Sequence, residues 1–329
     1  LRFTPKKDTQ IHLLRYGEDM GRRVYERTLQ FLFILAMRKE FPRARVCVRY
    51  SLGPGLFITV DGMEEPFNEE AALKVETEMR RLVRLKLPLE RRRISIKEAL
   101  SFYEQDGQAD KAKLLKWRRF SYFDVYQIDG YMDYFYGEMA PDTSYADVFR
   151  VKYVHDGAVV LLMPRSDAPD VPSDYVDLPK LHAVFHQSDE WGKLMECATV
   201  NDLNTHIQNG TIRELVRINE ALHDRGYADI ADKIVQKGAK AVLVAGASSS
   251  GKTTSAHRIS TQLRLQGCHP VMLSLDDYYI DRDKIERDEN GEIDLENINT
   301  LDIQRFGSDL AALIRGEKVE VPRFDFTNG

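Results

Sequence analysis

The first half of the chain mixes helical and strand-like hydrophobic patterns. Residues 22–39 carry apolar side chains at helical spacing, which predicts a helix. Strand-like runs follow within residues 45–60, and Asp129-Gly130 stands between two further apolar runs, a strong signal for a β-hairpin. Both periods occur in one stretch, so we expect an α+β domain over residues 1–187.

Helical patterns dominate the next stretch of the chain. Thr199 and Thr211 are suited to cap the starts of helices, while Gly210, Gly226 and Gly238 stand where helices would end. We therefore expect a helical connector over residues 188–238.

The pattern changes again from residue 239 onward. The continuous apolar run Ala241–Ala245 is typical of a strand buried on both faces of a parallel sheet. An amphipathic helix and a second apolar run, Val271–Leu275, follow it. Strand, helix and strand predict a βαβ unit with a right-handed crossover. Residues 239–329 thus predict an α/β domain with a doubly wound parallel sheet, of which we expect only the N-terminal portion here.

Composition restricts the class of protein without choosing a function. Hydrophobic residues make up 43% of the 329 residues and charged residues 30%, as in ordinary globular proteins. The three cysteines form no CxxC pair, so neither a disulfide framework nor a structural zinc site is expected, and a reducing cytoplasm is the expected location. The sequence has no apolar run long enough to span a bilayer, so we expect no membrane partner.

A phosphate-binding loop of the Walker A type lies between the first apolar run and the following helix. The sequence from Gly246 to Thr253 fits GxxxxGK[ST] in full. In such loops backbone N–H groups and the helix N-terminus hold phosphate oxygens, the lysine reaches the β- and γ-phosphates, and the hydroxyl binds Mg²⁺. We predict that the loop binds ATP and that Thr253 binds Mg²⁺. The predicted nucleotide-binding residues are Gly246, Ala247, Ser248, Ser249, Ser250, Gly251, Lys252, Thr253 and Thr254.

A carboxylate follows the second apolar run at Asp276. Ligands of doubly wound sheets bind at the carboxyl ends of the strands, so Asp276 is placed to accept a proton from an attacking hydroxyl. A contact to Mg²⁺-bound water and a plain helix cap remain as alternatives.

Segment 274–279, Ser-Leu-Asp-Asp-Tyr-Tyr, resembles a segment of uridine kinases, which are relatives of phosphoribulokinase. Segments 294–302 and 316–326 match two further stretches of that family in register. The resemblance implies Asp276 and Lys252 as catalytic residues. It also implies substrate contacts, which we assign to Glu296, Phe324 and Tyr279.

Departures from the kinase family make the acceptor uncertain. Asn297-Ile298 replaces the usual His-Pro, and Phe324 replaces the tyrosine that is common at the stacking position. We predict ATP-dependent phosphoryl transfer to the ribose of a nucleoside, with poor turnover by this stretch alone. The alternatives are a kinase for a sugar phosphate or vitamin precursor, and an RNA-associated or regulatory ATP-binding protein with a vestigial kinase part. A homo-oligomer is compatible with each.

The N-terminal half resembles the second additional, editing-type domain of threonyl- and alanyl-tRNA synthetases. The likeness lies in residues 28–46, in the turn at 50–55 and in residues 175–178. Members of that family bind metal through HxxxH and CxxxH pairs. Phe31 and Leu35 occupy the first pair here, and Pro179 the cysteine position. These residues cannot bind zinc, so we expect no metal-dependent deacylase.

Three features of this half allow a functional and a structural interpretation. Arg91-Arg92-Arg93 would suit RNA phosphates, but acidic residues nearby favour a solvated face. RNA is therefore not the expected partner, although it stays open. His182 and His186 lack a third ligand, which argues against a metal. The last feature is a set of aromatic residues that would stack bases but is better explained by hairpin core and cross-strand pairs: Tyr122, Phe123, Tyr126, Tyr131, Tyr134, Phe135 and Tyr136.

Overall fold

The computed structural model describes residue 8, residue 10, residues 12–281, residue 285 and residues 297–324. Contacts between Cα atoms divide the chain into unit 1, Leu1–Gly210, and unit 2, Thr211–Gly329. The domain limits predicted from sequence, at 187 and 238, stay predictions.

A four-stranded antiparallel sheet forms the centre of unit 1. Its strand order is β1-β2-β7-β6, and every neighbouring pair is antiparallel. The strands are β1 Arg45–Leu52, β2 Gly55–Asp61, β6 Arg150–His155 and β7 Ala158–Leu162. The strand-like runs predicted within residues 45–60 are confirmed as β1 and β2.

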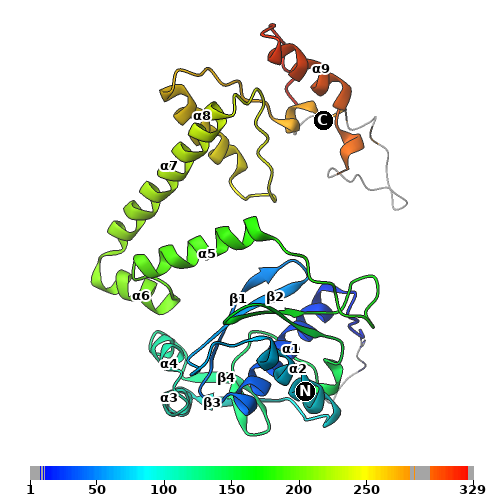
Figure 1. Cartoon of the computed structure of the whole chain (residues 1–329), viewed down its shortest axis with the longest axis vertical. Helices are drawn as coiled ribbons and strands as arrows, with labels where there is room; N and C mark the ends of the chain where they lie inside the picture. Colours follow the sequence, from blue (N-terminus) through cyan, green and yellow to red (C-terminus); the bar gives the residue numbers. More distant parts are fainter. Residues whose placement is uncertain (1–7, 9, 11, 282–284, 286–296, 325–329) are drawn as a thin grey trace. The chain divides into compact units, whose positions relative to one another are not determined.

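Two helices cover one face of this sheet (Figure 1). They are α1, Asp19–Glu40, and α2, Glu69–Arg84. From α1 the core takes fully buried side chains such as Leu29 and Leu32, which pack with Ile58 and Leu161 of the sheet. Alternate strand residues point to one face, so Ile58 and Leu161 face α1 while Phe57 and Val160 face away.

The opposite face of the sheet is covered by α5, Pro179–Leu194 (Figure 1). Tyr50 of β1 stacks on Phe185 of α5, with ring centroids 4.2 Å apart. The chain continues into α6, Val200–Asn209, where the Thr199 side chain accepts a hydrogen bond from the backbone N–H of Asp202. This confirms Thr199 as a helix cap.

A second, three-stranded antiparallel sheet carries two short helices. Its order is β3-β4-β5. Asp129 and Gly130, both at positive φ, form the turn between β4 and β5, as a two-residue hairpin of type I′ requires. The predicted hairpin is therefore confirmed. The elements are β3 Glu90–Ser95, α3 Ile96–Gln105, α4 Ala109–Leu115, β4 Tyr122–Ile128, β5 Tyr131–Asp133 and the 3₁₀ turn η1 Thr143–Tyr145.

The described part of unit 2 is largely helical. Helices α7 and α8 pack together through Ala231, Ile259 and Leu263. The Tyr227 hydroxyl of α7 lies 3.2 Å from the Ser255 hydroxyl of α8. The elements are α7 Ile212–Gln236, α8 Lys252–Leu265, η2 Leu275–Tyr278, η4 Ile298–Thr300 and α9 Ile303–Ile314. Gly226 lies inside α7, so the prediction of a helix end at this residue is wrong.

The two apolar runs predicted as parallel strands are not paired within the described residues. Residues 241–245 and 271–274 form no ladder there, and Leu243 and Val271 are 84% and 63% exposed. A strand needs a neighbour to satisfy its backbone N–H and C=O groups, and the described residues supply none to these runs. The doubly wound parallel sheet thus stays a prediction, while both described sheets are antiparallel.

Candidate nucleic-acid interface and phosphate loop

The arginine run lies on β3, beside the middle of β4. In the register of the two strands, Arg91 faces Tyr126 and Arg93 faces Asp124. Neighbouring strand residues point to opposite faces, so Arg91 and Arg93 share a face while Arg92 points to the other. The run is therefore split into two separate sets of contacts.

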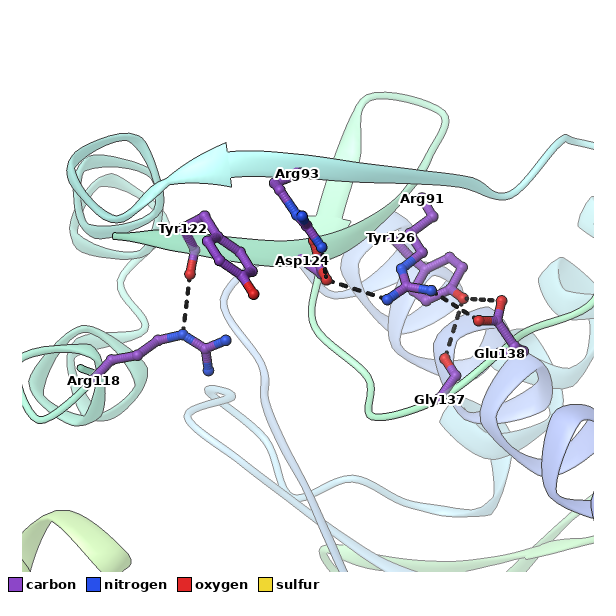
Figure 2. Close-up of polar contacts among 8 residues, drawn as sticks. All are labelled: Arg91, Arg93, Arg118, Tyr122, Asp124, Tyr126, Gly137 and Glu138. Atoms are coloured by element: carbon purple, nitrogen blue, oxygen red, sulfur yellow. Dashed lines mark hydrogen bonds and ion pairs between the residues drawn. The ribbon is translucent and has the colours of Figure 1, made fainter. Parts of the chain in front are cut away.

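Arg91 and Arg93 are held by carboxylates (Figure 2). Arg93 donates from Nε and Nη2 to the two oxygens of Asp124, at 2.8 and 3.1 Å. Arg91 donates to Asp124 at 3.2 Å and to Glu138 at 2.8 Å. The Arg93 hydrogen bonds, together with those of Arg91, hold the pKa of Asp124 below its ordinary value. Both arginines are thus largely neutralised.

Aromatic rings continue this network at both ends (Figure 2). The Arg93 guanidinium lies over the Tyr122 ring, 4.1 Å from its centroid. Tyr126, at the other end, donates to the carbonyl of Gly137 at 3.1 Å. Of the aromatic residues predicted as hairpin core, Phe123 and Tyr126 are buried. Tyr136 is 74% exposed and so is not part of the core, although its ring lies 5.6 Å from that of Tyr134.

A second basic segment, which sequence reasoning missed, runs from α4 to the start of β4. Residues 111–123 contain Lys111, Lys113, Lys116, Arg118 and Arg119 and no acidic residue. The signal in the sequence was that basic and aromatic residues are interspersed in this segment without an acidic residue, a pattern that indicates a nucleic-acid-binding surface.

The cations of this segment differ in their partners. Lys111 binds the buried carboxylate of Asp133. Lys113, Lys116 and Arg119 are exposed, and within the described part of the chain none of them forms an ion pair. Their full charge therefore faces solvent, in contrast to the paired arginines of β3.

Phe120 is an exposed ring next to these cations. Its ring is 60% exposed although two side chains, Arg118 and Tyr122, lie beside it. The Arg118 guanidinium lies 5.7 Å from its centroid, and the Tyr122 ring lies 5.8 Å away. Arg118 is itself fixed by a hydrogen bond to the Tyr122 carbonyl at 3.1 Å (Figure 2). Phe120 is thus held in place with much of its surface open.

The positions that correspond to the metal-binding pairs of the synthetase domain lie in different surroundings. Phe31 is fully buried and Leu35 is 3% exposed, both within the α1 core. Pro179 is the first residue of α5. Within the described residues no group of three or more His, Cys, Asp or Glu side chains is arranged to hold a metal. These hydrophobic side chains do not fit a metal.

His182 belongs to α5 and contacts Tyr50 and Phe57 of the sheet. Its Nδ1 is 2.7 Å from the Tyr50 hydroxyl, and its ring centroid is 6.0 Å from that of His155 and 6.5 Å from that of His186. Burial lowers the pKa of His182, and the two neighbouring histidines lower it further. The neutral ring is therefore favoured in this environment.

The phosphate loop of unit 2 is curled at the N-terminus of α8. Ser249 and Gly251 have positive φ, and a Cβ on Gly246 would lie 2.8 Å from the Ser250 hydroxyl. The Lys252 ammonium donates to the carbonyl of Ala247 at 2.8 Å, across the loop. Positive φ at Gly251 and the close approach at Gly246 favour glycine at these two positions, as in a backbone cradle for an anion. Residues 246–251 are exposed, as are Thr253 and Thr254.

The residues assigned to an acceptor are only partly brought together. Tyr279 and Phe324 lie with ring centroids 5.5 Å apart. Asp276 is exposed in η2 and makes no hydrogen bond or ion pair with the described residues. Glu296 lies outside the described residues. The roles assigned to these four residues stay predictions.

Comparison with known proteins finds threonine–tRNA ligases among the relatives of this chain. A threonine–tRNA ligase of Carboxydothermus hydrogenoformans is 27% identical over 150 residues, which are 43% of this chain and 22% of the ligase. The chain is similar to threonine–tRNA ligases. Those of Acetivibrio thermocellus (26% over 116 residues, 35% of this chain, 18% of the ligase) and Clostridium kluyveri (22% over 152 residues, 46% and 24%) match as well.

The likeness concerns the N-terminal, synthetase-like part and confirms that half of the expected resemblance. The chain spans about a fifth of the length of these relatives. No family model matches it. The described helices include none that is long and apolar enough to cross a bilayer.

These findings correct the predicted function. The prediction of a nucleoside kinase, with its assignment as a phosphotransferase, is wrong: the relatives are named as ligases of threonine and tRNA. The expectation that RNA is not a partner is wrong for the same reason. The phosphate loop 246–253 is a short motif, whereas the likeness to threonine–tRNA ligases extends over 150 residues. The alternative of an RNA-associated ATP-binding protein agrees better with the relatives.

Proposed function

We propose that this chain is an RNA-associated, ATP-binding protein, in which unit 1 binds tRNA-type RNA and unit 2 binds the nucleotide. The observation that carries the proposal is the likeness of the N-terminal part to threonine–tRNA ligases. The acid-free basic segment 111–123 supports it, because exposed lysines and arginines contact RNA phosphates. The net charge of −5 argues against a general attraction to nucleic acid, so binding depends on a local surface.

The proposal does not include metal-dependent removal of an amino acid from tRNA. Phe31 and Leu35 fill the core at the positions where metal ligands would be needed. Unit 1 would therefore bind RNA without that chemistry.

The RNA part is tested by titrating labelled tRNA with the whole chain and following fluorescence anisotropy over a series of salt concentrations. We expect binding at low salt, with the logarithm of the association constant falling linearly with the logarithm of the salt concentration. Unlabelled tRNA should displace the label more readily than a DNA duplex does. Lack of binding at about 50 mM salt, where phosphate contacts are strongest, would refute the proposal.

The nucleotide part rests on the curled loop 246–253. Backbone N–H groups and the α8 N-terminus would hold the phosphates, Lys252 would leave the Ala247 carbonyl for the β- and γ-phosphates, and Thr253 would bind Mg²⁺. Calorimetry with ATP and Mg²⁺ tests this. Lys252→Ala should abolish the binding heat, while Lys240→Ala, at an exposed lysine of the same unit, should preserve it. Equal heats for both variants would place the nucleotide elsewhere.

A further inference from the structure

We infer that the RNA lies on the surface formed by Lys113, Lys116, Arg119 and Phe120, hereafter the α4–β4 surface. In this arrangement the three cations contact successive phosphates, and an unpaired base stacks on the Phe120 ring. The inference rests on the proposed function and goes further, since it specifies a single-stranded segment of RNA and the residues that bind it.

The cations of the α4–β4 surface are free for phosphates, unlike those of β3. Lys113 and Lys116 are three residues apart at the end of α4, so they point to the same side. Neither they nor Arg119 is neutralised by a carboxylate within the described residues. Arg91 and Arg93, by comparison, would have to leave Asp124 and Glu138 before binding a phosphate. Attraction of an RNA backbone is therefore stronger at the α4–β4 surface than at the paired arginines of β3.

Phe120 has the properties of a stacking platform. Arg118 and Tyr122 hold the ring, which lowers the entropy that it would lose on binding. The ring nevertheless remains 60% exposed. Bases within a duplex are already stacked on each other, so an aromatic side chain gains a contact only with an unpaired base. The ligand is thus expected to contain a single-stranded segment.

The position of the α4–β4 surface is fixed by contacts within unit 1. Lys111 binds buried Asp133, and the Trp117 indole N–H donates to Asn201 of α6 at 3.0 Å. Segment 116–121, which carries Lys116, Arg119 and Phe120, is thereby anchored at both sides, since β4 begins at Tyr122. A fixed surface loses little freedom when RNA binds.

The experiment compares two RNA hairpins, one blunt-ended and one with a single-stranded tail, in anisotropy titrations with the whole chain. Wild type should bind the tailed hairpin more tightly. Phe120→Ala should weaken binding of the tailed hairpin on the order of tenfold, leave the blunt hairpin unchanged and so remove the preference. Phe120→Trp should restore the preference. The matched control is Tyr145→Ala, which removes a ring that is 59% exposed in an acidic stretch of unit 1.

Charge is tested by the triple variant Lys113→Gln, Lys116→Gln, Arg119→Gln. It should reduce the slope of log K against log salt by about 2 to 3. Its control also removes three positive charges, from cations that are paired elsewhere in unit 1: Arg43, Arg45 and Lys74. That control should leave the slope unchanged.

The outcomes separate the inference from the function on which it rests. If wild type binds neither hairpin nor tRNA, both fail. If wild type binds RNA while the Phe120 and triple variants behave like their controls, RNA binds at another surface and only the inference fails. Unfolding in urea, followed by the fluorescence of Trp117 and Trp191, shows that each variant is folded before it is titrated.

Discussion

The Lys111 ammonium lies 2.6 and 2.7 Å from the two carboxylate oxygens of Asp133, a residue that is only 2% exposed. Asp133 also accepts a hydrogen bond from the backbone N–H of Tyr134 at 2.8 Å. A carboxylate buried in this way is stable only while it is paired. The pair joins α4 to β5 and so fixes the helix that carries the α4–β4 surface.

Lys111→Met should therefore destabilise unit 1. The variant leaves the Asp133 carboxylate buried without its cation, and we expect a loss of about 3 kcal/mol in the free energy of unfolding. Urea unfolding followed by tryptophan fluorescence measures it, because both tryptophans belong to unit 1. Lys113→Met on the same helix is the control and should change stability by about 0.5 kcal/mol or less. Similar losses in both variants would show that the ion pair does not hold α4.

The elements of unit 1 that could be predicted are those in which local sequence and tertiary packing agree. Thr199 was expected to begin a helix, and its side chain accepts a hydrogen bond from the backbone N–H of Asp202 at the start of α6. Asp129-Gly130 alone determined a hairpin, because few other residues tolerate positive φ at both turn positions. Strand β3 was missed because its polar run Glu90–Arg93 has no period-two apolar pattern and is a strand only through its pairing with β4.

The candidate interface was harder to predict for a similar reason. Adjacent arginines suggested a basic patch, but the sequence did not show that Asp124, thirty-one residues from Arg93, would neutralise two of them. Conversely, the free cations Lys113, Lys116 and Arg119 are spread along a helix and a loop, so no compact run marked them. Whether a charge is available to RNA depends on its partners in the folded chain.

Phe31 stands at a position of the first metal-binding pair, and its burial predicts that unit 1 loses stability when the side chain is removed. Phe31 is fully buried and packs with Tyr131 and Phe135 at centroid distances of 5.8 and 5.3 Å. Phe31→Ala should therefore cost about 3–5 kcal/mol through lost burial and the cavity that remains. Phe120→Ala removes the same side chain from an exposed place and should cost about 0.5 kcal/mol or less. Urea midpoints of the two variants give the comparison. A small loss for Phe31→Ala would mean that this position does not belong to the core.

His182 makes unit 1 sensitive to acid. Its pKa is lowered in the folded state, through burial first and then through His155 and His186, whereas Asp177 acts in the opposite direction. Below the ordinary value of 6.5 the unfolded chain gains the proton first, so stability should fall as the pH drops through the window between 6.5 and the lower folded-state pKa. His182→Gln should reduce this fall. Urea midpoints of both proteins from about pH 5 to pH 8 test it. A constant difference between them at every pH would show that the ring does not titrate in this window.

Asp124 limits the charge that unit 1 presents to RNA. Asp124→Asn would remove the carboxylate partner of Arg93 and weaken the hold on Arg91, which still pairs with Glu138. The slope of log K for tRNA against log salt should become steeper by about 1 to 2, a full unit for Arg93 and a smaller part for Arg91. Glu138→Gln weakens the hold on Arg91 alone and should have a smaller effect, at most about half.

Asp61→Asn, which releases Arg45 on β1, is the control for the same change in net charge and should leave the slope unchanged. If all three variants steepened the slope equally, net charge and not the position of the arginines would govern RNA binding. A graded response would instead show that the β3–β4 network keeps two arginines from RNA while their neighbours on the α4–β4 surface remain free.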